Sequence, residues 1–94
     1  SEEARGVVEQ IARLLEPLGA GNITPDGRAA DIGPLMDEGV PGMSLKVDGT
    51  RYFWYHHTNA DTMDKLDPHE LNLCVAAMAI VAYVVADMPE ALPR

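Results

Sequence analysis

The sequence predicts an α/β fold, built from about three helices and one β-hairpin. Three observations support this prediction. Apolar residues recur at helical spacing near the start of the chain, and a long apolar stretch follows helix-start signals near its end. Between them, Asp48-Gly49 separates two strand-like runs. The 94 residues are enough for one small core, so we expect a single domain over residues 1–94.

The first segment, "SEEARGVVEQIARLLEPLG", predicts an amphipathic helix. Ser1 is the expected N-cap, with Glu2 and Glu3 in the first turn. Pro17 is expected to stop regular hydrogen bonding, and Gly19 and Gly21 to end the element. The apolar face consists of residues three and four positions apart: Val7, Val8, Ile11, Leu14, Leu15 and Leu18.

The middle of the chain predicts a loop, a short helix and a hairpin. Residues 20–30 read as a loop with a turn at Pro25-Asp26-Gly27. In residues 31–39, Asp31 is the expected N-cap of a helix and Gly39 its end. A strand over 42–47 and an aromatic strand over 51–55 are then expected to pair through an Asp48-Gly49 turn.

A long apolar helix is predicted to begin after Asp67, which acts as N-cap. Pro68 suits the first helical position, and Glu70 would complete a capping box. From residue 71 to 86 only Asn72 is markedly polar, so we expect burial on most sides. About 16 apolar residues without basic flanks are too few for a membrane span, which needs roughly 20. One hairpin and two further helices cannot cover such a helix, which indicates part of a larger α/β protein.

The composition narrows the partners of the protein. Fifteen acidic residues against seven basic ones give a net charge of −8. Without a basic patch, nucleic acids and anionic membranes are not expected partners. A single cysteine, Cys74, allows no internal disulfide. The start "SEEARG" lacks both an initiator Met and a signal peptide, as expected of a mature, processed or excised segment.

The stretch "WYHHTNADT" contains the residues best suited to metal binding or catalysis. If the aromatic strand continues through His56 and His57, their side chains point to opposite faces and cannot readily share one metal ion. Zinc needs three or four ligands, and His69 and Cys74 do not complete a set. Spacing alone leaves two readings open, a structural strand end or a single ligand. Asp61-Thr62 could likewise cap the next turn or orient a histidine ring.

Three quoted segments together resemble a known family: "ADIGPLMDEGVPGMSL", "YFWYHHTNADTMDKLDP" and "AYVVADMPEALPR". They look like the C-terminal part of a zinc exopeptidase of the di-zinc aminopeptidase family, in its plasma glutamate carboxypeptidase branch. The resemblance covers essentially the whole chain. It implies an incomplete piece of a mixed-sheet, helix-flanked fold whose intact active site holds two zinc ions.

The resemblance also implies roles for individual residues. The family's last zinc ligand is a histidine followed by three residues and Asp-Thr, which is His57 here. His56 would lie beside it near the substrate cleft, and Asp31 matches an acidic position close to the substrate pocket. The other ligands and the catalytic glutamate have no match in this chain, so no catalytic residue is assigned. The piece is therefore expected to be inactive alone.

The resemblance further implies a peptide substrate, the remainder of the peptidase domain as a partner, and secreted or periplasmic location. We expect an isolated piece with uncovered apolar surface to self-associate. Two alternatives remain at this point. One is a non-catalytic protein-interaction module on the same scaffold. The other is a small autonomous metal-binding protein that uses His56, His57 and His69.

Overall fold

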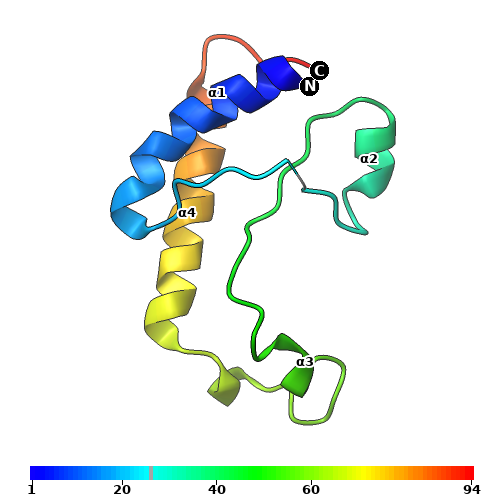
Figure 1. The fold of residues 1–94 in the computed structure, drawn as a ribbon, viewed down its shortest axis with the longest axis vertical. Coiled ribbons are helices and arrows are strands. Elements are labelled where there is room, and N and C mark those ends of the chain that lie inside the picture. Colours follow the sequence, from blue (N-terminus) through cyan, green and yellow to red (C-terminus); the bar gives the residue numbers. More distant parts are fainter. Residues whose placement is uncertain (26) are drawn as a thin grey trace.

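The computed structural model describes residues 1–25 and 27–94, and the described part is helical. The helices, in order, are α1 (Glu2–Ala12), the 3₁₀ helix η1 (Arg13–Leu18), α2 (Gly33–Asp37), α3 (Tyr52–Tyr55), the 3₁₀ helix η2 (Met63–Lys65) and α4 (Pro68–Asp87). Figure 1 shows an open, curved arrangement in which α1 lies across the C-terminal half of α4. An extended trace runs from α2 to α3 on the other side, and both chain termini lie near one end.

The predicted α/β fold is wrong, because no residue in 1–25 or 27–94 lies in a β-strand. Residues 41–49, which include the expected first strand, form no regular structure. The expected second strand is instead a single helical turn, α3, in which the His56 amide donates to the Tyr52 carbonyl at 3.0 Å.

Local hydrogen bonds explain why the hairpin does not form. The Asp48 carboxylate accepts from the Thr50 amide at 2.9 Å, an Asx-type turn two residues long. The Gly49 carbonyl then accepts from the Tyr52 amide at 3.0 Å and starts the helical turn. Gly49 does not adopt the positive φ that a two-residue Asp-Gly hairpin turn requires. An isolated hairpin is also marginal without a third strand or a helix against it.

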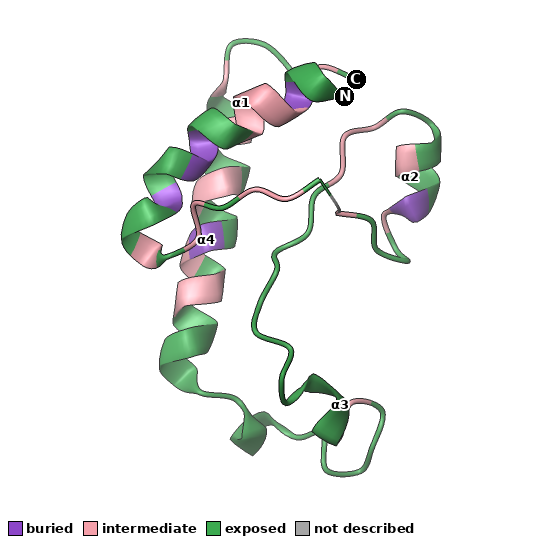
Figure 2. Cartoon of the chain, in the orientation of Figure 1, coloured by how far each residue is buried: buried purple, intermediate pink, exposed green. Residues whose placement is uncertain are grey.

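The core lies where α1 and η1 pack against α4. Ser1 caps α1 as predicted, since its hydroxyl accepts from the Ala4 amide at 3.1 Å. Gly19 ends η1 as predicted, with a left-handed φ of 74°. The buried apolar side chains of the described residues are few and mostly small: Ala4, Ile11, Ala12, Leu15 and Ala77. Figure 2 shows these buried positions along α1, η1 and one face of α4.

Helix α4 begins as predicted and is largely uncovered in this chain. The Asp67 carboxylate accepts from the Glu70 amide at 2.9 Å, and Pro68 occupies the first turn. Within α4, whose residues are all described, Ala77 is the only buried one. Within the described residues, α1 and η1 are the elements that pack against α4, so this chain leaves the helix largely uncovered, as expected of part of a larger protein.

Helix α2 lies within the predicted range, with a different start. Its N-cap is Ile32, which makes no side-chain cap bond, and Asp31 is exposed one residue earlier. Gly39 follows the helix with a φ of 83°, as its predicted role as a terminator requires. Arg28 binds Asp37 with two hydrogen bonds of 2.8 and 3.0 Å, which tie the preceding loop to α2.

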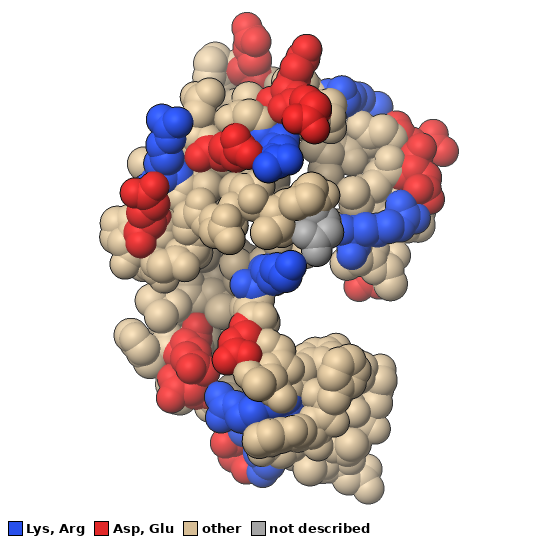
Figure 3. Space-filling model, viewed as in Figure 1, with Lys and Arg blue, Asp and Glu red and all other residues tan. Residues whose placement is uncertain are grey.

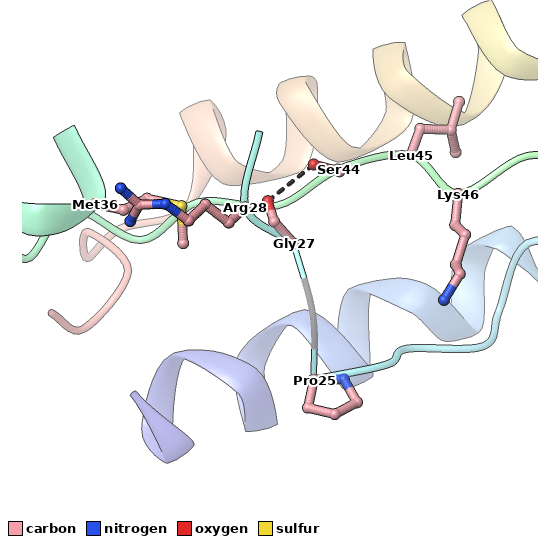
Figure 4. A pocket seen from close by; sticks show the side chains of 7 residues that line it. All are labelled: Pro25, Gly27, Arg28, Met36, Ser44, Leu45 and Lys46. Carbon is pink, nitrogen blue, oxygen red and sulfur yellow. Dashed lines mark hydrogen bonds between the residues drawn. The ribbon is translucent and has the colours of Figure 1, made fainter. Parts of the chain in front are cut away.

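The loop before α2 crosses the extended segment after it at Gly27. A side chain at Gly27 would meet the Met43 Cα atom at 3.3 Å, so glycine permits the close crossing. Figure 4 shows the Ser44 hydroxyl donating to the Gly27 carbonyl there, a bond of 2.8 Å, beside a hollow of about 420 Å³. The predicted turn at Pro25-Asp26-Gly27 includes Asp26, which lies outside the described residues.

The molecule is more open than a complete domain of its size. Its accessible surface is 7504 Å², against about 5,300 Å² for a folded monomer of 10.2 kDa. Its radius of gyration is 15.0 Å, against about 12.4 Å for a compact domain of this length. Much apolar surface that a folded protein normally buries is thus exposed.

Candidate functional site

The candidate site is the loop from His56 to Thr62, called here the histidine loop, between α3 and η2. Thr58 holds it closed. Its hydroxyl donates to the Tyr55 carbonyl at 2.6 Å and accepts from the Ala60 amide at 3.2 Å, while its amide also bonds Tyr55 at 2.9 Å. The Thr58 carbonyl in turn accepts from the Asp61 amide at 3.1 Å. The bonds between Tyr55 and Thr58 enclose the two histidines as the central residues of one turn, and the bond between Thr58 and Asp61 closes the next.

His57 has a left-handed backbone with φ 57°, the only positive φ among the described non-glycine residues. Non-glycine residues rarely adopt this region, although His, Asn and Asp do so more often than the others, and unusual backbone conformations cluster at functional sites. It follows His56, whose φ and ψ of −51° and 124° are those of the first central residue of a type II turn. This reversal aims the exposed His57 side chain differently from a continuing strand.

The two histidine rings lie on the same side of the chain, which contradicts the predicted opposite orientation. Their centroids are 3.8 Å apart and their planes make an angle of 44°. His56 is also stacked on Tyr52, with centroids 4.4 Å apart, and its Nε2 lies 3.5 Å from the Tyr52 hydroxyl. The prediction failed because it assumed a strand; Tyr52 and His56 are four residues apart on a helical turn.

Two contacts anchor the aromatic turn α3, and the sequence analysis predicted neither of them. Phe53 meets the His56 ring edge-on, with centroids 5.9 Å apart, and Arg51 pairs with Glu70 of α4 at 3.7 Å. The latter contact connects the start of α3 to the first turn of α4. The spacing of Tyr52 and His56 would have suggested their stacking had residues 52–56 been taken as helical.

The end of the histidine loop has its own polar cluster. The Thr62 hydroxyl donates to the Asp64 carboxylate, and Lys65 donates to the other Asp64 oxygen at 2.6 Å. Both bonds lower the pKa of Asp64, which falls to about 2, and the bond from Lys65 has the larger effect. Thr62 therefore bonds to a side chain instead of capping the following turn, and η2 has no side-chain cap.

The remaining candidates lie elsewhere. Figure 1 places α2, which follows Asp31, and α3, which precedes the histidines, at opposite ends of the extended trace. Among the described residues no hydrogen bond or ring contact joins Asp31 to His56 or His57. His69 is exposed in the first turn of α4, and Cys74 is half-buried further along that helix.

The described residues do not assemble a metal centre by themselves. No group of three or more His, Cys, Asp or Glu side chains in 1–25 and 27–94 is arranged to hold an ion. The His57 ring nevertheless suits a single ligand, since it is exposed and no hydrogen bond engages it within the described part of the chain. A complete centre would need further ligands from outside these residues.

Comparison with protein families decides the affiliation of the chain. The model of Peptidase family M28 matches residues 2–83, a range that spans α1, the histidine loop and most of α4. The chain belongs to peptidase family M28. The resemblance to a zinc exopeptidase stated from the quoted segments is thereby confirmed at the level of the family.

Individual members of this peptidase family are similar over the whole chain. Carboxypeptidase Q of Mus musculus is 44% identical over 94 residues, that of Homo sapiens 45% over 94 residues, and that of Xenopus laevis 45% over 92 residues. The alignments cover 98–100% of this chain and 20% of each relative. The chain thus spans about a fifth of the length of these peptidases. No solved structure matches it.

Proposed function

We propose that this chain is the segment of a zinc-dependent exopeptidase that supplies the last zinc ligand, His57, to a two-zinc site. The supporting observation is the position of His57. It lies within the M28-matched range, precedes Asp61-Thr62 by the family spacing, and presents an exposed ring on a backbone fixed by the closed histidine loop.

The role of each loop residue follows from its contacts. A neutral His57 ring nitrogen can bind a metal, while Thr58 is occupied by backbone bonds and does not compete. His56 lies beside His57, is fixed by stacking on Tyr52, and faces the peptide substrate in this proposal. Zinc, when bound, polarises the scissile carbonyl and lowers the pKa of its coordinated water.

Substitution of the two histidines in the full-length protein tests the assignment. His57→Ala should remove zinc and reduce kcat/KM together, by on the order of a hundredfold or more, since even residues that only support a ligand are worth 10–100-fold. His56→Ala should keep zinc and reduce kcat/KM alone. Zinc per protein is measured by elemental analysis beside the kinetics. If His56→Ala empties the site and His57→Ala does not, the assignment is reversed.

The 94-residue chain alone is expected to be inactive. A catalytic zinc needs about three protein ligands, and the described residues contain no such group. Incubation of the purified chain with a dipeptide and zinc should give no hydrolysis above the chelated control. Zinc-dependent turnover by this piece would contradict the proposal.

Asp31 is proposed as a substrate-binding residue of the assembled enzyme. Its carboxylate is exposed and makes no hydrogen bond within the described residues, so it is available to a polar substrate group. In the full-length protein, Asp31→Asn should raise KM and leave zinc content unchanged. Glu38→Gln, which removes an exposed acid on the other side of α2, is the matched control. Equal KM values for both variants would show that Asp31 has only a structural role.

The full-length enzyme is expected to be secreted or periplasmic, as the resemblance implies. Fractionation of cells that express it tests this expectation. Recovery of the intact protein in the cytosolic fraction alone would contradict it.

A further inference from the structure

Two side chains meet across the ends of the histidine loop. Tyr55, the last residue of α3, precedes the loop, and Lys65, the last residue of η2, follows it. The Lys65 ammonium lies over the Tyr55 ring, 5.8 Å from its centroid. An ammonium within about 6 Å of an aromatic ring centroid is attracted by the negative face of the ring. This contact, called here the loop clamp, joins the chain before His56 to the chain after Thr62.

The Lys65 ammonium is also connected to the end of the loop through Asp64. One Asp64 carboxylate oxygen accepts from Lys65 at 2.6 Å, and the other accepts from the Thr62 hydroxyl. The Lys65 side chain is 33% exposed, against 68% for Asp64, so the lysine is partly covered. Removal from water strengthens the attraction between a cation and an aromatic ring. The loop clamp is therefore stronger than a contact between fully exposed groups.

The sequence separation of its partners distinguishes the loop clamp from the other contacts of this region. Lys65 and Asp64 are neighbours in the chain, so their ion pair forms whether or not the loop is closed. The bonds of Thr58 to Tyr55 and to Asp61 each close a turn of four residues. By contrast, Tyr55 and Lys65 are ten positions apart and meet only when the whole loop between them is closed. The clamp therefore stabilises the closed form of the complete histidine loop.

Tyr55 connects the clamp to the unusual backbone of His57. The Tyr55 carbonyl accepts from the Thr58 hydroxyl at 2.6 Å and from the Thr58 amide at 2.9 Å, and these bonds enclose both histidines. His57 has a φ of 57° there, a conformation that persists only where the surrounding contacts hold it. A restraint on the Tyr55 ring is thus a restraint on the residue that closes the turn around His57.

A second contact of α3 with a later element has none of these properties. Arg51 lies 3.7 Å from Glu70, and the two side chains are 59 and 68% exposed. Exposed ion pairs of this kind contribute little to stability. Figure 3 shows the basic and acidic side chains of the lower lobe gathered on the side of η2, whereas its opposite side is uncharged. Arg51 therefore provides a nearby cation that can be removed without loss of the loop clamp.

We propose that Lys65 and Tyr55 are positioning residues that hold the histidine loop closed, so that His57 is presented to zinc in one orientation. The inference rests on the proposed function of His57 as a zinc ligand. A ligand that is already fixed loses less conformational entropy on binding than a mobile one, so the closed loop favours bound zinc. Opening the loop should therefore release zinc faster, although no ligand has been removed.

Hydrogen exchange in the full-length protein tests the clamp itself. Lys65→Met removes the charge and keeps an unbranched side chain, whereas Lys65→Arg keeps a cation that can lie over the ring. In Lys65→Met, peptides covering residues 58–62 should exchange about two- to fivefold faster, the factor expected from one partly exposed cation–ring contact. Lys65→Arg should exchange at the unchanged rate. Unchanged exchange in Lys65→Met would overturn the proposal, whatever the role of His57.

Substitution of the ring tests whether the two residues act through one contact. Tyr55→Phe keeps the aromatic face and should leave the exchange rate unchanged, whereas Tyr55→Leu should accelerate exchange as Lys65→Met does. The double variant of Lys65→Met and Tyr55→Leu should exchange no faster than either single variant, because both remove the same interaction. Fully multiplicative acceleration in the double variant would show that no shared contact exists and would overturn the proposal.

The rate of zinc release to a chelating dye tests the positioning role. The full-length Lys65→Met and Tyr55→Leu variants should release zinc about two- to fivefold faster, whereas Lys65→Arg, Tyr55→Phe and the control Arg51→Met should not. If His57→Ala loses zinc but Lys65→Met releases it at the unchanged rate, the positioning role is wrong and the proposed function stands. If His57→Ala keeps all of its zinc, the proposed function is wrong, and the positioning role falls with it.

Discussion

At the residue scale, the backbone of His57 has two consequences, one for chemistry and one for stability. The left-handed φ of 57° turns its ring toward that of His56, so both rings can face one space. An L-residue in this conformation is about 1–2 kcal/mol less stable than in its preferred region. Removing the His57 side chain therefore has a conformational effect as well as a chemical one.

Two substitutions of His57 separate these effects. Both His57→Ala and His57→Gly remove the ring, while only glycine adopts the positive φ of 57° freely. We expect the glycine variant of the full-length protein, compared without zinc, to be up to about 1 kcal/mol more stable than the alanine variant. Urea unfolding followed by circular dichroism measures the difference. A less stable glycine variant would indicate that the loop does not keep this conformation in the intact enzyme.

Asp64 provides a pH-dependent contact in the exposed cluster after the histidine loop. Its pKa is lowered to about 2 by hydrogen bonds from Lys65 and then Thr62. Because the folded pKa lies below the unfolded value, the ionised carboxylate stabilises the fold above about pH 4, and this contribution is lost as the pH falls toward 2. Lys65→Met should raise the Asp64 midpoint, measured by carboxyl-carbon NMR. A midpoint that stays near 2 would mean that Lys65 is not the main cause.

At the element scale, helix boundaries that depend on local chemistry could be predicted. Ser1 and Asp67 cap their helices by the expected side-chain bonds, and Gly19 ends η1 with a positive φ. Each of these signals involves residues only a few positions apart. The wrong cap of α2 shows the limit, because Asp31 has the right chemistry one residue too early.

Strand pairing could not be predicted in the same way. A strand is stabilised by its neighbour, and residues 42–47 have no paired neighbour within the described chain. Local bonds from Asp48 and the turn of α3 then determine the conformation. The orientation of the histidines was wrong for the same reason, since it rested on the period of a strand. Their position after the aromatic run, and the family they indicate, did not depend on it.

The cap of α4 gives a prediction for this element. Asp67→Ala removes the acceptor of the Glu70 amide, which lies 2.9 Å away, and should destabilise the protein by about 1 kcal/mol. In the full-length protein, whose relatives are about five times as long as this chain, the expected loss in Tm is at most about 2–4 °C, the value for domains of roughly 150–250 residues. Asp67→Asn, which keeps an acceptor oxygen, should stay close to the unchanged chain in a thermal melt. Equal losses for both would mean that charge, not capping, is the main contribution.

At the scale of the whole molecule, composition predicted a larger protein, although it could not indicate which surface covers α4. The all-round apolar character of α4 indicated burial, yet the described chain covers it only at Ala77. Burial depends on distant segments, and these lie outside a chain that spans a fifth of its relatives. Under the proposed assignment of His57 as a zinc ligand, its fellow ligands likewise lie outside the described residues, which contain no group of three potential ligands.

The isolated chain is expected to self-associate through its uncovered apolar side chains. Fourteen large hydrophobic residues are exposed among those described, which is unusual for a soluble monomer. Light scattering should show dimers or larger species that increase with concentration, and Val75→Asp with Met78→Asp should reduce them. The control is Glu90→Gln, a change beyond the C-terminal end of α4. A monomer at all concentrations would contradict the expectation.

The packing of α1 on α4 also imposes an order on biosynthesis. The two helices are partners in the core, yet residues 13–67 separate them. At about 5–20 residues per second, α1 leaves the ribosome several seconds before α4 is complete. During that interval α1 and η1 lack the face of α4 that they pack against in the described structure, so we expect their apolar residues Ile11 and Leu15 to be open to chaperones.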